Sequence, residues 1–185
     1  KAFGTSSIMI GDTTTGTIDA ANYNTGLGVD VFGALTTGDD NTAVGYLALN
    51  DNTTGVRNVA IGSTSLDVNT TGGDNVAVGA NALGANTTAS NNTGVGSAAL
   101  MANTTGAYNT GLGNSAMIAN TTGANNVAVG YQALDANTTA DENTAVGYHA
   151  LTANTTGYYN TAIGKDALAA NTTASSNTAV GRDAL

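Results

Sequence analysis

The sequence predicts an all-β protein, a parallel β-solenoid (β-roll) in which one 17-residue repeat forms each coil and about eleven coils stack. The first observation is a strict period: Asn recurs at positions 24, 41, 58, 75, 92, 109, 126, 143, 160 and 177. The second is that no insertion or deletion interrupts these ten copies. Because each unit of a stacked array contacts only its neighbours, an extra residue would displace every column of side chains.

The third observation is the length of the unit, which excludes the other repeat architectures. Helical repeats need about 33 to 47 residues for two helices, and Gly with β-branched residues in every unit disfavours a single helix. Hairpins favour Asn-Gly or Asp-Gly turns, and the sequence contains neither dipeptide. We therefore expect each coil to hold two short strands and two turns.

The columns of the repeat predict a role for each position, counted from the recurrent Asn as position 1. Position 4 is always Val, Ile or Leu, so we expect it to point inward and meet position 9. Position 2 is Thr or Val and should be partly buried. Position 5 is always Gly, which indicates a positive φ or a backbone too crowded for a Cβ. The Asn columns at positions 1 and 12 should form hydrogen-bonded ladders.

Position 3 is Ala or Gly in all ten copies, and it would point away from position 4. This column is the predicted intersubunit face, formed by Ala43, Ala60, Ala77, Ala128, Ala145 and Ala162. The alternative is that small residues relieve crowding inside a flat coil.

The chain divides into residues 1–23, a degenerate N-terminal coil, and residues 24–185, a single solenoid domain of ten in-phase repeats whose last copy is partial. The segment 7–11 keeps the phase because it precedes 24–28 by one full repeat and shares the pattern of aliphatic residues followed by Gly. The chain begins with Lys, so we expect a processed product or a piece of something longer, and stacking of copies head to tail would nearly continue the coil.

Composition narrows the classes of function. Only 9% of residues are charged, against about 25% in soluble proteins, and the formal net charge is −9. We expect no binding of nucleic acid and no membrane insertion, because a basic surface and a long apolar run are both missing. The chain has no Cys, so thiol chemistry and thiolate metal sites are excluded.

The repeated pattern Asn-x-Ala-Val/Ile-Gly-x-x-Ala-Leu, over residues 24–185, resembles the head repeats of YadA-like trimeric autotransporter adhesins. Related repeats are also familiar from phage tail fibres. The resemblance implies a left-handed parallel β-roll that forms trimers and is displayed outside a cell or on a virion. The unit here is longer than the usual head repeat, because Asn-Thr-Thr-Gly adds a second turn.

No residues form an evident catalytic, metal or cofactor site, and we expect a protein that is not an enzyme. The one His, His149, should be exposed to solvent. The acidic pairs Asp39-Asp40 and Asp141-Glu142 are interpreted as solvated turn charge, because a calcium site needs several converging oxygens. Nine N-x-Thr sequences could accept glycans, but eight of them, the Asn of the Asn-Thr-Thr motifs, are better interpreted as ladder residues.

The variable columns hold the candidates for specific contacts. Tyr131 and Tyr148 occupy position 6 of adjacent coils, with Tyr46 in the same column, and these side chains either contact a partner or form a stabilising tyrosine ladder. We expect an extracellular structural or adhesive fibre protein that associates with itself, as a homotrimer or a head-to-tail polymer. The alternatives are an ice-binding solenoid that uses the Thr columns at positions 13 and 14, a glycan- or protein-binding adhesin head, and a phage tail-fibre segment.

Overall fold

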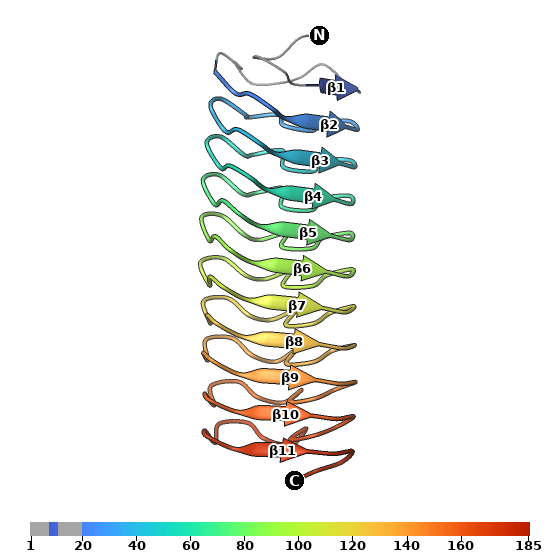
Figure 1. Cartoon of the computed structure of the whole chain (residues 1–185), viewed down its shortest axis with the longest axis vertical. Helices are drawn as coiled ribbons and strands as arrows, with labels where there is room; N and C mark the ends of the chain where they lie inside the picture. The colour runs from blue at the N-terminus through green and yellow to red at the C-terminus, as the bar shows by residue number, and fades with distance from the viewer. Residues whose placement is uncertain (1–7, 11–19) are drawn as a thin grey trace.

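The computed structural model describes residues 8–10 and 20–185, and its regular elements are eleven strands of three residues each. In chain order these are β1 (Ile8–Ile10), β2 (Thr25–Leu27), β3 (Thr42–Val44), β4 (Val59–Ile61), β5 (Val76–Val78), β6 (Thr93–Val95), β7 (Thr110–Leu112), β8 (Val127–Val129), β9 (Thr144–Val146), β10 (Thr161–Ile163) and β11 (Thr178–Val180). They form one parallel sheet in the order of the sequence, and the coils stack into a rod (Figure 1). The prediction of an all-β parallel solenoid is confirmed.

Neighbouring strands pair at a constant offset of one repeat. Thr144 pairs with Thr161, for example, and Ile8 of β1 pairs with Thr25 of β2. The strand at 8–10 therefore has the register that its sequence phase predicts, whereas the rest of the expected coil up to residue 19 lies outside the described residues. The prediction of two strands per coil was wrong. Each described coil has one strand, and its remaining residues form turns whose backbone groups bond to the coils above and below.

The strands present the opposite face to the interior from the one expected. Their central residue, position 3, is buried, whereas the aliphatic residue at position 4 is half-buried or exposed. Position 9 does point inward: Leu100 and Leu134 are fully buried. The space between the sheet and this Leu column is narrow, because a Cβ added to Gly111 would lie 3.2 Å from Leu100 Cγ. Only Ala or Gly fits at position 3, so the alternative of crowding inside a flat coil is the correct one.

This assignment of faces is tested by two substitutions in β8. Ala128→Leu should lower the free energy of unfolding by about 1–3 kcal/mol, since Ala128 is completely buried and added carbons overpack the core. Val129→Ala should cost less than about 1 kcal/mol because Val129 is outside the core. Urea denaturation measures both, and a larger loss for Val129→Ala would show that the faces are reversed.

The Gly column at position 5 satisfies both conditions predicted for it. The ten φ angles lie between 126° and 144°, where L-residues are strained. A Cβ on Gly130 would also lie 2.4 Å from the carbonyl oxygen of Gly147 in the next coil. Each coil therefore turns tightly against its neighbour directly after its strand.

Three further columns adopt the left-handed conformation without glycine. Positions 7 and 9 have φ angles of 49–57° and 49–60° in the ten copies, and position 17 has 55–63° in the nine complete copies and at Tyr23. β-Branched residues are the least tolerated in this region, and positions 9 and 17 contain none. These three residues and the Gly produce the sharp changes of direction that close a coil within a single repeat.

The two predicted Asn ladders are present and lie inside the rod. In the position 1 ladder, Asn109 Oδ1 accepts a bond from the backbone N–H of Asn126 at 3.0 Å, and Asn126 Nδ2 donates to Ala140 O at 2.8 Å. In the position 12 ladder, Asn120 Nδ2 donates to Asn103 Oδ1 at 2.9 Å and to Gly123 O at 3.0 Å. Within the described part of the chain, every buried side-chain nitrogen and oxygen has a partner. The ladders thus satisfy turn groups that the short strands cannot reach.

Candidate functional site

The first candidate surface is the outer sheet face, which we define as the first and third residues of strands β2 to β11. The first residue is Thr or Val and the third is Val, Ile or Leu, so the face carries no charged side chain. Leu27, Ile61, Leu112 and Ile163 are 40–48% exposed even though neighbouring strands partly cover them. A column of aliphatic side chains and a column of Thr and Val therefore run side by side along the rod. Such a contiguous apolar surface is typical of an interaction site, whereas single scattered apolar residues are not.

The predicted intersubunit face was assigned to the wrong residues. The six alanines at position 3 (Ala43, Ala60, Ala77, Ala128, Ala145 and Ala162) are all 0% exposed in the single chain. They face the position 9 Leu column across the interior. Successive side chains of a strand point to opposite faces, so the central residue points inward while the first and third residues point outward. The signal that could have identified the correct face was the strict size limit at position 3, which is typical of a crowded interior.

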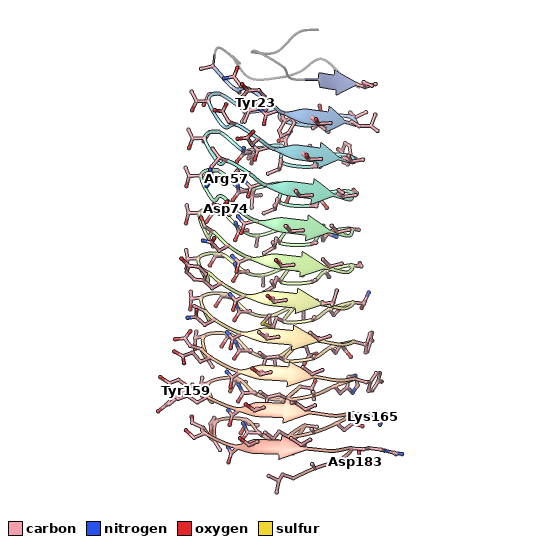
Figure 2. All side chains as sticks on the ribbon, viewed as in Figure 1. Tyr23, Arg57, Asp74, Tyr159, Lys165 and Asp183 are labelled. Atoms are coloured by element: carbon pink, nitrogen blue, oxygen red, sulfur yellow. The ribbon has the colours of Figure 1, made fainter. Side chains whose placement is uncertain are left out.

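The second candidate surface is the position 6–7 edge, which we define as the two residues that follow the invariant Gly in each coil. Figure 2 shows Lys165 and Asp183 on this edge, where the strands end, and Tyr159 on the opposite edge. From Asn58 to Asn125 the edge carries side chains no larger than Asn. The last four coils instead carry Tyr131-Gln132, Tyr148-His149, Lys165-Asp166 and Arg182-Asp183.

Tyr131 and Tyr148 form the ladder that their spacing predicts. Their ring centroids are 5.5 Å apart with an angle of 15° between the planes, and each residue is 45% exposed. Lys165 Nζ lies 5.5 Å from the centroid of Tyr148. Tyr46, 53% exposed, has no ring contact among the described residues. Two of the three predicted contact residues therefore come together and the third stands alone.

His149 is held within this group, so the prediction of a simply solvent-exposed His was wrong. Its ring stacks on Tyr148 with 3.9 Å between centroids, and its Nε2 lies 2.9 Å from Gln132 Oε1. Its Nδ1 lies 3.7 Å from Asp166 Oδ1, and its side chain is 30% exposed. The cause is the stacking of coils, which places position 7 side chains from adjacent coils against one another.

The acidic pairs act within turns. Asp39 Oδ1 accepts a bond from the backbone of Asn22 at 2.6 Å, and Asp141 Oδ1 accepts one from the backbone of Ala124 at 2.7 Å. Among the residues described, no three His, Cys, Asp or Glu side chains converge in a group that could hold a metal ion. No helix in the described part of the chain is long and apolar enough to cross a membrane.

Two local environments shift pKa values. The hydrogen bond from Arg57, at 2.6 Å in an exposed ion pair, lowers the pKa of Asp74 below its usual value and raises the pKa of Arg57. Burial raises the pKa of Asp67. The Asp74 contribution to stability is present above the ordinary Asp pKa and is lost as pH falls through the lowered value, and it is small because the pair is screened by solvent.

The N-x-Thr sequences fall into two structural groups. The Asn of the Asn-Thr-Thr motifs belongs to the position 12 ladder, and Asn52 through Asn154 in that column are completely buried. Each donates its amide hydrogens within the rod, so the ladder interpretation is confirmed for these residues. Asn91 is different because it is exposed at position 17.

The two Thr columns of the Asn-Thr-Thr motif also differ from each other. The hydroxyl at position 13 donates to the backbone of the next coil, as Thr53 Oγ1 does to Thr70 O at 2.9 Å. The column at position 14 is exposed. Only one of the two Thr columns considered for ice binding is therefore open to solvent along the rod.

Sequence reasoning missed a second pair of aromatic residues on the opposite edge. Tyr158 and Tyr159 pack edge to face with centroids 5.2 Å apart, and both are more than half exposed. They were missed because their columns, positions 16 and 17, vary freely in the other copies.

Comparisons of the chain with protein-family models, with curated proteins and with solved structures find no match.

Proposed function

We propose that this chain is a non-enzymatic structural protein, a rod that associates side by side with copies of itself to build an extracellular or virion-surface fibre. The observation that carries the proposal is the outer sheet face, a continuous uncharged column of Val, Ile and Leu that a single chain leaves partly exposed. The resemblance of the repeat to head repeats of trimeric adhesins supports both the location and a trimeric arrangement.

The size of the face is consistent with this role. Ten strands about 4.8 Å apart and three residues wide give a strip of about 50 by 10 Å, or about 500 Å² per copy. Two such strips bury about 1,000 Å² together, near the lower end for a specific interface. Because the coils of two copies have the same spacing, their aliphatic columns can meet in register along the whole length, which compensates for the narrow width.

The proposal predicts that charge on this face prevents association without unfolding the chain. We expect Leu112→Glu combined with Val129→Glu to convert the assembly into monomers, since each carboxylate would be buried without a partner in the interface. The measurement is molar mass by light scattering during size-exclusion chromatography, with circular dichroism to verify folding.

The matched control is Thr122→Glu combined with Thr139→Glu, in the same coils but in the exposed column at position 14. It adds the same charge and should leave the mass unchanged. A wild-type chain that remains monomeric at the highest accessible concentration would refute the proposal.

A further inference from the structure

We infer that the position 6–7 edge carries a binding site for a neutral saccharide, centred on Tyr131 and flanked by Asn114 and Gln132. This site is separate from the outer sheet face and goes beyond the structural role proposed above. Asn114 and Tyr131 occupy position 6 of adjacent coils, and the backbone N–H of Gln132 donates to Asn114 O at 3.1 Å, which places these side chains next to each other.

The fold does not require large side chains here. The four coils from Asn58 to Asn125 close with Ser, Thr, Ala and Asn at positions 6 and 7, and they have the same strand register and the same glycine conformation as the coils that follow. The Tyr, Gln and His side chains at positions 6 and 7 of the later coils are therefore not required for the solenoid to fold. Exposed aromatic residues are costly in water and common in recognition sites.

Tyr131 has one covered face and one open face. Tyr148 stacks on the first face, as described above. The residue next in the column on the other side is Asn114, which is exposed and too small to cover a phenol ring. No other ring contacts this second face among the described residues. A flat apolar surface is thus available at the boundary between the coil of Asn109 and the coil of Asn126.

The neighbouring polar groups suit hydroxyl groups of a ligand. Asn114 Oδ1 accepts a bond from Ser115 at 3.0 Å, and Gln132 Oε1 is 2.9 Å from His149 Nε2. These contacts fix both amides with their NH₂ groups unused by any protein acceptor that the structure describes. The Asn114 amide, in the coil before Tyr131, and the Gln132 amide, next to Tyr131 in the chain, can each donate to hydroxyl oxygens at the rim of a sugar ring.

Charge selects a neutral ligand of this kind. Asn114, Ser115, Tyr131 and Gln132 are uncharged, and the nearest cation on the edge, Lys165, is paired with Asp166. On a chain of net charge −9, an anionic glycan or nucleic acid would find no compensating positive field. The C–H face of a neutral sugar, in contrast, matches the negative π face of the phenol ring. Four coils span only about 15 Å, too little for a protein interface of ordinary size.

Tyr148 and His149 act as positioning residues. Tyr148 holds the Tyr131 ring by stacking, and His149 holds the Gln132 amide by its hydrogen bond. A site whose side chains are ordered before binding loses less entropy when the ligand arrives. The proposal therefore assigns contact with the sugar to Tyr131, Asn114 and Gln132 only.

The test is an array of neutral and acidic oligosaccharides probed with the full chain, followed by calorimetric titration of the strongest neutral binder. We expect Tyr131→Ala to weaken binding at least 10-fold and Gln132→Ala several-fold. The control Tyr46→Ala removes a similarly exposed tyrosine from the same column and should leave the affinity unchanged. Tyr148→Phe should bind normally and Tyr148→Ala weakly, because stacking needs only the ring.

Saturation-transfer NMR of the wild-type chain gives an independent readout that does not depend on the folding of any variant. Transfer between the Tyr131 ring and the C–H protons of the sugar is expected. The inference is overturned by a wild-type chain that binds no neutral glycan at millimolar concentration, by binding only to acidic glycans with strong salt dependence, or by equal affinity of Tyr131→Ala and wild type.

Discussion

Gly130→Ala is expected to unfold the coils around it and to lower the free energy of unfolding by at least about 4 kcal/mol. The φ of Gly130 is 136°, and a non-glycine residue held in a sparsely populated backbone region costs about 1–3 kcal/mol. The added Cβ would also meet backbone atoms of the next coil, Gly147 O at 2.4 Å and Gly147 C at 2.6 Å. Backbone cannot move aside as a flexible side chain can, so the two coils must separate. Urea denaturation monitored by circular dichroism measures the loss.

Two other glycines separate the causes of this effect. Gly181 has a similar φ of 126°, but a Cβ there would meet no atom within 4 Å, so Gly181→Ala measures the backbone strain without the overlap. Gly84 has neither the positive φ nor a contact closer than 3.3 Å, and Gly84→Ala should be nearly neutral. We expect Gly130→Ala to be the most destabilising of the three substitutions, Gly181→Ala to be intermediate and Gly84→Ala to be the least destabilising. An equal loss for the first two would show that contact between coils does not limit position 5.

Asn92→Ala is expected to lower the free energy of unfolding by several kcal/mol. Asn92 is completely buried; its Nδ2 donates to Gly106 O at 2.9 Å and its Oδ1 accepts from the backbone N–H of Asn109 at 2.9 Å. The substitution leaves one buried donor and one buried acceptor without partners, at about 1–3 kcal/mol each. Hydrogen exchange should locate the damage, because the Asn109 amide loses its protection. The exposed Asn114 provides the control, and Asn114→Ala should change stability by less than about 0.5 kcal/mol.

Asn92→Asp adds a pH dependence to the same position. Burial would raise the pKa of the introduced carboxyl above its unfolded value of about 3.9, because the charged form is desolvated. The folded state then holds the proton more tightly than the unfolded state. The variant should therefore be most stable below about pH 4 and lose stability as pH rises through the raised folded pKa. Melting curves at several pH values measure this trend, and stability that increases with pH over that window contradicts it.

Much of the fold follows from the period alone. A strict repeat without insertions fixes the number of coils, the parallel register and the columns, and an invariant Asn in a stacked array implies a ladder. The Gly column was also predictable, since an invariant Gly indicates a backbone conformation or a close approach that a Cβ would prevent. These predictions succeed because a solenoid repeats the same local environment, so that ten copies act as independent observations of one site.

The orientation of the strand was not predicted because hydrophobicity is a poor guide in so thin a core. Val129 is more apolar than Ala128, yet the smaller residue is inside. The interior between a strand and the position 9 Leu has room for one methyl group at most, so size decides rather than transfer free energy. The single strand per coil was missed for a related reason: left-handed residues at positions 7, 9 and 17 replace the second strand. The absence of β-branched residues at positions 9 and 17 was the available signal.

The candidate saccharide site was only half visible in the sequence. The spacing of Tyr131 and Tyr148 predicted their stacking, because equivalent positions of adjacent coils are always neighbours. The contact between Gln132 and His149 was not predicted, since position 7 varies among the copies and His149 was expected to face solvent. Knowledge of the backbone direction at the left-handed position 7 was needed to place these side chains beside the rings.

The constant pairing offset has a consequence for how such a chain can change over generations. A deletion or duplication of one repeat's codons joins a coil to a neighbour with the same Asn at position 1, the same Gly at position 5 and a large apolar residue at position 9, so the register of the columns is kept. Unequal recombination between repeats therefore lengthens or shortens the rod in steps of about 4.8 Å while the fold stays the same. The length of the rod can be selected separately from the proposed saccharide site, because length depends on the number of coils and the proposed site on the few variable side chains of individual coils.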